Sequence, residues 1–250
     1  MGDKTDVEDP LLSAHRLAKF YVIASGDALL SCCDLVGRDF PMHIGSGALA
    51  RVTAENASKA MFMADPAISW KARVLRAHAL FVGALSEYKS SNEPGARALI
   101  DSWQRWRSRT SSMFTDVPRQ TAGNSRKLIE DHFDAPLAYD ELSRPTHGNA
   151  VWLTLAVIQE QKRTNYTWCA TLRNMQFAID VTLAASRRLC ELWDLDAAEV
   201  LAASNARLGR PGQGLGWDEL LGACDFARTN VDFLSRNVVV DSSEDSQPVR

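Results

Sequence analysis

The sequence predicts an all-α protein, a single helical bundle of seven to ten helices. Apolar residues recur at the three- and four-residue spacing of amphipathic helices along most of the chain. An aspartate followed by proline, a typical helix-start signal, occurs at Asp9-Pro10 and again at Asp65-Pro66. Strand-like alternation is nearly absent, and one β-branched run, Val238-Val239-Val240, lies near the end of the sequence.

The first half of the chain is expected to hold four helices. Ser46 is a candidate N-cap, and Asp65-Pro66 opens the third helix. The connection between the second and third helices is short, so we expect them to pack as an antiparallel hairpin. The expected helices cover about residues 10–37, 46–64 and 66–89, then a stretch that carries Trp103 and Trp106, before a linker at residues 116–124.

Proline also sets the expected boundaries in the second half. Pro136 starts a helix that runs through Leu142, Pro145 interrupts it, and Ser143 is a plausible N-cap of the helix that follows. Asp196 is expected to cap a later, shorter helix. The other expected helices surround Trp152 up to residue 163 and cover residues 165–193 and 217–236, with a glycine-rich loop at 210–216.

The chain is expected to form one folded domain. The apolar stripes continue on both sides of the 116–124 linker, which favours a single bundle over residues 10–236. Residues 1–9 and the polar residues 237–250 are expected to be disordered.

Composition excludes several classes of protein. The net charge of −3 argues against a dedicated duplex-DNA binder. No run of about 18 apolar residues occurs, so no membrane span is expected. The five cysteines show no Cys-x-x-Cys spacing, and no Glu-x-x-His pair occurs, so neither a disulfide framework nor a metal or cofactor site is expected. The acidic start lacks an apolar signal region, which favours the cytoplasm.

Charged residues lie on helix faces that should be apolar. Arg51 and Glu55 are four residues apart, and Arg73 and Arg76 are three apart, so each pair shares a helix face. Inward-facing charges are costly unless they are paired or used. We expect the four residues to form one connected cluster, either as structural ion pairs or as the wall of a pocket that binds an anion.

A second polar set comprises Tyr139, Ser143 and His147, spaced four residues apart. His147 is the candidate general base, with Ser143 and Tyr139 as further catalytic candidates. The alternative is that Ser143 caps a helix and His147 fills an interhelical contact. No Gly-x-Ser-x-Gly elbow occurs, so a serine hydrolase is not expected.

Three motifs together resemble a set of uncharacterised all-helical proteins of actinobacteria: Arg51-x-x-x-Glu55, the following Asp65-Pro66, and Tyr139-x-x-Leu142-Ser143-x-x-x-His147. That set is distantly similar to HEPN-type domains, which recur in abortive-infection and toxin systems. The resemblance covers about residues 45–195 and implies a cytoplasmic helical protein that binds RNA or nucleotides, commonly as a homodimer.

One motif of HEPN ribonucleases is missing at His147. Those enzymes carry an arginine and a histidine with four to six residues between them, and His147 has no arginine at that spacing. Three other pairs do fit it, and they are Arg38 with His43, Arg73 with His78, and Arg126 with His132.

Three functions stay open on this basis. The resemblance favours RNA or nucleotide binding in stress or phage defence. The alternatives are a small-molecule enzyme or binding protein with a helix-lined Arg/Glu/His pocket, and a non-catalytic interaction module. The expected partners are RNA or an anionic small molecule, and a second copy of the chain; enzymatic activity is left open.

Overall fold

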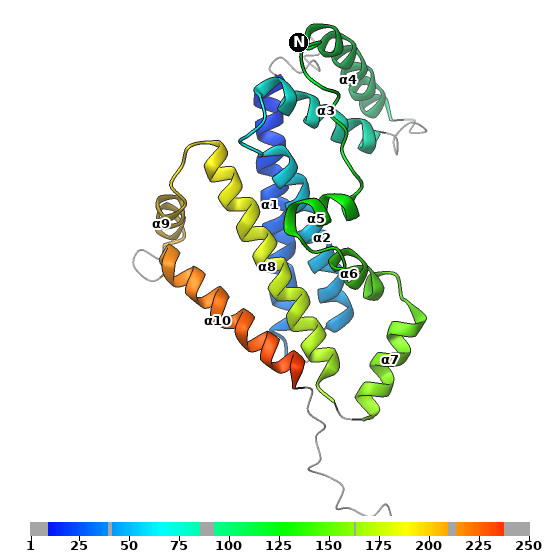
Figure 1. Ribbon diagram of the computed structural model, residues 1–250, viewed down its shortest axis with the longest axis vertical. Coiled ribbons are helices and arrows are strands. Elements are labelled where there is room, and N and C mark those ends of the chain that lie inside the picture. Colours follow the sequence, from blue (N-terminus) through cyan, green and yellow to red (C-terminus); the bar gives the residue numbers. More distant parts are fainter. Residues whose placement is uncertain (1–9, 40–41, 86–92, 163, 210–213, 238–250) are drawn as a thin grey trace, which may run out of the picture.

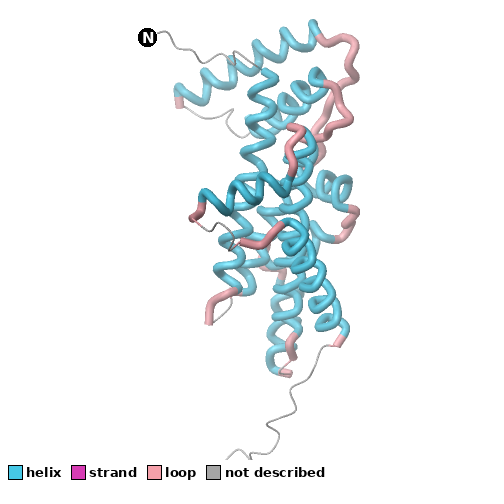
Figure 2. Tube along the Cα trace, turned by 90° about the vertical axis from the view of Figure 1, so that its left-hand side faces the viewer, coloured by secondary structure: helices cyan, strands magenta, loops and turns pink. Residues whose placement is uncertain are grey.

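The computed structural model describes residues 10–39, 42–85, 93–162, 164–209 and 214–237 of the chain. Within these residues there are ten α-helices and no β-strand, which confirms the predicted all-α bundle (Figure 1). Figure 2, turned by 90°, shows the same arrangement of helices joined by loops. The helices are α1 (Pro10–Val36), α2 (His43–Met63), α3 (Trp70–Leu85), α4 (Pro94–Met113), α5 (Ser125–Phe133), α6 (Ala138–Thr146), α7 (Ala150–Gln161), α8 (Tyr166–Leu192), α9 (Ala197–Arg207) and α10 (Trp217–Arg236).

Helices α1, α2 and α8 form the centre of the bundle (Figure 1). Helix α2 is enclosed most fully, with 11 of its 21 residues buried, and it contacts α1, α8, α5 and α6. Most of its buried side chains are small, and small contact residues allow helices to pack at short interaxial distances. The core at this centre is built from Cys32, Val36, Ala50, Ala54, Ala57, Ala60, Met61, Ala178, Val181 and Ala185.

Helices α5 and α6 cover a further side of α2. Ile129 of α5 and Leu142 of α6 are fully buried and belong to the central core. Near the C-terminus of α6, Pro145 packs against the backbone of α2 at Gly47. A Cβ atom on Gly47 would lie 2.8 Å from Cγ of that proline. This contact fixes where the end of α6 sits on α2.

Helices α3 and α4 lie at one end of the molecule, far from α7 and the end of α10 (Figure 1). Trp103 of α4 stacks on Phe81 of α3 with 3.8 Å between ring centroids. At the opposite side α10 packs on α8, where Arg228 donates to Asp180 over 2.9 Å. Helix α7 has no buried residue.

Several predicted helix starts are confirmed and others are wrong. Asp196 caps α9 by accepting from the backbone N–H groups of Ala198 and Glu199, and the last helix spans residues 217–236 as expected. Ser46 is not a cap, because α2 begins earlier, at His43, and the Ser46 hydroxyl donates to the carbonyl of His43.

Asp65-Pro66 does not open a helix. The Asp65 carboxylate accepts from the N–H of Ala67 and forms a turn, and α3 begins only at Trp70, where Ser69 accepts from the N–H of Ala72. The predicted hairpin is wrong as well, since α2 packs along α1 and touches α3 only slightly. The turn directs α3 away from α2, so the two helices cannot pack side by side.

Pro145 does not break α6, contrary to the prediction. It lies in the last turn, where the missing N–H removes a single intrahelical hydrogen bond, and its ring is buried against α2. Ser143 is therefore inside the helix, with its hydroxyl donating to the carbonyl of Tyr139, and the cap of α7 is Asn149. The expected disorder of residues 1–9 and of the tail after residue 237, together with the Asp9 cap, lies outside the described residues.

The contact between Gly47 and Pro145 predicts a difference between two glycine substitutions. A Cβ atom on Gly26 in α1 would meet no heavy atom within 4 Å beyond its own stretch of helix, so Gly26→Ala gains only helix propensity. Gly47→Ala gains the same propensity and adds an overpacked contact. We expect its free energy of unfolding, measured by urea denaturation, to be about 1–3 kcal/mol below that of Gly26→Ala. Equal values would show that α6 is not seated on Gly47.

Candidate functional site

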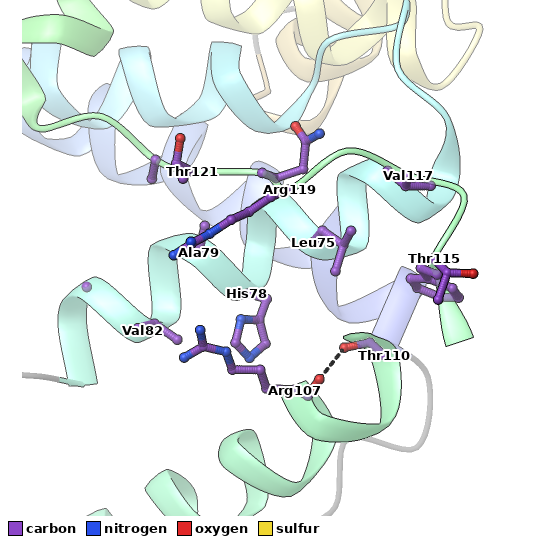
Figure 3. Close-up of a pocket in the computed structure, with 14 residues that line it drawn as sticks. Leu75, His78, Ala79, Val82, Arg107, Thr110, Thr115, Val117, Arg119 and Thr121 are labelled. Carbon is purple, nitrogen blue, oxygen red and sulfur yellow. Dashed lines mark hydrogen bonds between the residues drawn. The ribbon is translucent and has the colours of Figure 1, made fainter. Parts of the chain in front are cut away.

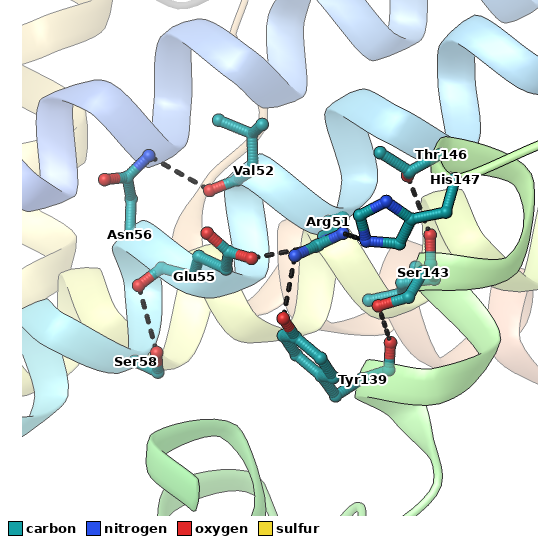
Figure 4. A network of polar contacts seen from close by, with 10 residues as sticks. Arg51, Val52, Glu55, Asn56, Ser58, Tyr139, Ser143, Thr146 and His147 are labelled. Carbon is teal, nitrogen blue, oxygen red and sulfur yellow. Dashed lines mark hydrogen bonds and ion pairs between the residues drawn. The ribbon is translucent and has the colours of Figure 1, made fainter. Parts of the chain in front are cut away.

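Arg51 joins the two predicted polar sets on α2 and α6 (Figure 4). Its Nε donates to Glu55 Oε1 over 2.8 Å, one terminal nitrogen donates to the Tyr139 hydroxyl over 2.7 Å, and the other lies 2.7 Å from Nε2 of His147. The Arg51 side chain is 15 % exposed and that of Glu55 is 23 % exposed, whereas His147 lies at the surface. The arginine therefore ties α6 to α2 at the edge of the bundle.

The contact with Arg51 decides the role of Nε2 in the His147 ring. Arginine can only donate, so Nε2 of His147 is the acceptor of this hydrogen bond. A general base needs a free lone pair at the nitrogen that takes the proton. In this arrangement the lone pair is occupied, and the Ser143 hydroxyl is bonded to the carbonyl of Tyr139. The geometry thus lacks an assembled base and nucleophile.

Two guanidinium groups lie close to the ring of Tyr139. The guanidinium carbon of Arg51 is 4.8 Å from the ring centroid, and that of Arg126 is 5.5 Å from it. Arg126 also forms an ion pair with Asp140, one residue further along α6. Cation–π contacts of this kind stabilise the folded protein and hold the guanidinium groups beside the aromatic ring.

Arg73 and Arg76 hold the C-terminus of α2. Arg73, only 5 % exposed, donates to the carbonyls of Met63 and Asp65 over 3.0 and 2.6 Å. Arg76 donates to the carbonyl of Phe62 over 2.6 Å and to the Asp65 carboxylate over 3.2 Å. The last carbonyls of a helix have no intrahelical donor and carry partial negative charge, so two cations stabilise this end.

The expected single cluster of Arg51, Glu55, Arg73 and Arg76 is therefore wrong. Arg51 lies twelve residues before Met63, which places it about 18 Å along α2 from the carbonyls that Arg73 and Arg76 bind. The first pair contacts α6, and the second pair caps α2. Of the two pairs, only Arg51 and Glu55 lie beside predicted catalytic residues.

A cavity of about 650 Å³ lies between α3, α4 and the segment 114–122, and none of Arg51, Glu55, Tyr139, Ser143 and His147 lines it (Figure 3). Phe114 packs edge-on against Trp70, Lys71 bonds Asp116 over 2.7 Å, and Gln120 accepts from Arg76, so three contacts hold this segment against α3. The cavity wall includes His78, Ala79 and Val82 of α3, Arg107 and Thr110 of α4, and Arg119 of the segment.

His78 is the unusual member of the cavity wall. The residue is 6 % exposed, and its Nε2 is buried without a hydrogen-bond partner. Burial lowers the pKa of His78, a hydrogen bond with the backbone of Trp103 opposes this, and the charge of Arg107 lowers the pKa further. Such orphaned buried groups are rare in folded proteins and call for a cause.

Sequence reasoning had one signal for this histidine. Arg73 and His78 fit the arginine–histidine spacing of HEPN ribonucleases, but the structure separates them, because Arg73 turns to the α2 terminus and His78 turns to α4. Arg119 lies in the stretch expected to be a plain linker. Arg107 directly follows Trp106 on α4, where Trp103 is buried and Trp106 is partly buried.

Comparison with known protein families, with curated proteins and with solved structures found no match to this chain. Within the described residues no three His, Cys, Asp or Glu side chains gather closely enough to share a metal ion. No helix of the described part of the chain has the length and apolar character of a membrane span.

The capping role of Arg73 predicts a large loss of stability on substitution. Arg73→Met removes two hydrogen bonds to carbonyls at a buried helix end, and bonds to charged groups contribute about 1.5–3 kcal/mol each. We expect the free energy of unfolding to fall by about 3–6 kcal/mol in urea denaturation. Lys127→Met, which breaks an exposed pair with Asp131, should unfold within error of the wild type. An Arg73→Met protein as stable as that control would exclude the capping role.

Three histidines predict a loss of stability in mild acid. Burial lowers the pKa values of His43, His78 and His132 below the ordinary 6.5, with Arg76 adding to the effect at His132. Below pH 6.5 the unfolded chain binds protons that the folded chain rejects, so stability is complete above this pH and declines as the pH falls. The urea midpoint should decrease between about pH 7 and about pH 5, and less so in His132→Gln. A midpoint that is flat over this range would contradict the burial of neutral imidazoles.

Proposed function

We propose that the protein is a cytoplasmic binding protein for a phosphorylated small molecule, which occupies the cavity between α3 and α4. The observation that carries the proposal is the pair of arginines at this cavity. Neither guanidinium of Arg107 and Arg119 has a hydrogen bond or an ion pair within the described residues. Figure 3 draws the two side chains extending toward the same half of α3, with their guanidinium groups beside Val82 and Ala79.

The neighbouring charges support this assignment. Lys71 and Arg76, which border the same segment, are both paired with aspartates. Among the described residues no carboxylate side chain lines the cavity, so an anion there would meet attraction from both arginines and no opposing charge from those residues. Guanidinium groups bind phosphate through two parallel hydrogen bonds, and Thr110 supplies a hydroxyl at the same wall.

The size of the cavity supports a small molecule rather than a single ion. Ligand pockets usually enclose about 300–1,000 Å³, and the 650 Å³ here fall within that range. Apolar side chains such as Leu75 and Val82 form much of the remaining wall. A nucleotide-sized ligand matches both properties, and it agrees with the nucleotide binding in stress or phage defence that the resemblance implies.

A second candidate function is RNA binding at the edge of α2 and α6. It is favoured by the stack of Arg51 and Arg126 on Tyr139, with His147 exposed beside it. Single-stranded RNA is bound through such combinations of flat rings and cations. The nearby carboxylates of Glu55 and Asp140 oppose a phosphate chain, and this makes the edge the weaker of the two candidates.

Calorimetric titration of the whole protein with pyrophosphate and with ADP tests the proposal. We expect both to bind the wild type and the control Arg109→Gln, which changes an exposed arginine of α4 outside the cavity. The double variant Arg107→Gln/Arg119→Gln should lose binding by about tenfold or more, since each lost charged hydrogen bond costs at least about 1.5 kcal/mol. Undiminished binding by the double variant, or no binding by the wild type, would overturn it. Binding of a short single-stranded RNA that is lost in Arg126→Gln and kept in the double variant would favour the second candidate.

A further inference from the structure

We infer that the outer face of α10 is an interaction surface for a basic amphipathic helix of a partner protein. This outer face comprises Gly222, Phe226, Thr229 and Phe233, with a row of aspartates on one flank. It lies on a different helix from the cavity between α3 and α4 and from the edge of α2 and α6, so the inference is independent of the proposed function.

Helix α10 packs against the rest of the protein through one side. It contacts α8 along its length and α9 slightly (Figure 1), and its buried residues, Cys224 and Val231, lie seven residues apart on one face. Phe226 and Phe233 each follow one of these positions by two residues, which places them about 200° around the helix axis from the buried face. The two rings therefore point to the surface, where they are 73 % and 64 % exposed.

The two phenylalanines form the kind of apolar line that a helical partner contacts. A single exposed apolar residue is common on protein surfaces, but residues seven apart lie in line along a helix, about 10 Å from each other. Gly222, one turn before Phe226, leaves a hollow in the same line, because a Cβ atom there would meet no heavy atom within 4 Å beyond its own stretch of helix. Side chains of a helix lying along α10 can pack between these rings and into this hollow.

The flank beside the phenylalanines is negatively charged. Asp218, Asp225 and Asp232 are spaced seven residues apart, so they form one row along α10, and all three are exposed. Asp225 forms an ion pair with Arg228, and the other two have no ion pair within the described residues. Arg236, at the end of the helix, is the cation next to this row, which therefore keeps a net negative charge. Lysine or arginine side chains on a partner helix would complement it.

The other flank of the outer face carries amides in place of a charged row. Asn230 and Asn237 donate to the carbonyls of Phe226 and Phe233 over 2.7 and 2.9 Å. A partner that covers these amides leaves those hydrogen bonds intact. A helix with apolar residues over the rings and cations over the aspartates thus matches the whole face.

The aspartate row also disfavours other occupants. In an antiparallel pair of α10 helices, one from each of two copies of the chain, the aspartate flanks would face each other, and like charges in contact are destabilising. The phosphates of RNA and the surface of an anionic membrane would be repelled in the same way. A basic helix gains from both the rings and the row.

A synthetic peptide provides the probe for this surface. It consists of three heptads, about 21 residues, with leucine at the two core positions, lysine at the two flanking positions and alanine elsewhere, and its counterpart carries glutamate in place of lysine. In fluorescence-anisotropy titrations with the whole protein, we expect the lysine peptide to bind about tenfold or more tightly than the glutamate peptide. Its affinity should fall as salt is added, because exposed charges are screened.

Two double variants and a control locate the binding. Phe226→Ser/Phe233→Ser should weaken binding of the lysine peptide by about tenfold or more, whereas Phe20→Ser, which changes a 62 % exposed phenylalanine of α1, should not alter it. Asp225→Lys/Asp232→Lys reverses the charge of the row and should make the glutamate peptide the tighter ligand. All these positions are exposed, so circular dichroism should show the helix content of the wild type, and either double variant suffices if the other fails to fold.

Several results would overturn the inference. They are a lysine peptide that does not bind the wild type, an affinity that persists in Phe226→Ser/Phe233→Ser, and a preference that does not change in Asp225→Lys/Asp232→Lys. A dimer detected by light scattering that the phenylalanine variant abolishes would assign the surface to a second copy of the chain instead. Each of these results leaves the titrations with pyrophosphate and ADP unaffected, so the two proposals fail separately.

Discussion

The enclosure of α2 is the constraint on which the rest of the structure depends. Small residues such as Ala54 and Ala57 allow α1 and α8 to pack closely against it, and Gly47 does the same for the end of α6. The end of α2 is buried as well, since Met63 and Ala64 are fully buried, and each unsatisfied buried carbonyl is costly. Arg73 and Arg76 supply the missing donors, and in doing so they fix the start of α3 at the end of α2.

This constraint explains why the arginines of the sequence were easy to find and hard to interpret. Arginines on a core-facing stripe were correctly predicted to need partners. The partners of Arg73 turned out to be backbone carbonyls, which every residue possesses and no sequence pattern marks. The partners of Arg51 include Tyr139 and His147, 88 and 96 residues away, and the similar four-residue spacings gave no sign that the two sets meet.

Local hydrogen bonding separates the helix ends that were predictable from those that were not. Asp196 caps α9 with its own carboxylate, three residues at most from the groups it bonds, so its sequence context was sufficient. The helix end at Pro145 was not predictable from local sequence. Proline usually ends a helix, but the contact of its ring with Gly47 keeps the last turn of α6 in place. At Asp65 two local signals compete, and the turn prevails because Arg76 holds the carboxylate.

The cavity depends on contacts that are long in sequence and individually ordinary. Gln120 reaches Arg76 across 44 residues and Asp116 reaches Lys71 across 45, and together they hold an irregular segment beside α3. Composition indicates only a linker there. Three arginine environments result: Arg73 bonded to carbonyls, Arg51 bonded to side chains, and Arg107 and Arg119 without partners in the described part of the chain. The first two sets have their donors occupied by the fold itself, so the ligand that we propose is assigned to the third. This pair lies beside the one buried imidazole nitrogen that has no hydrogen bond in the described residues.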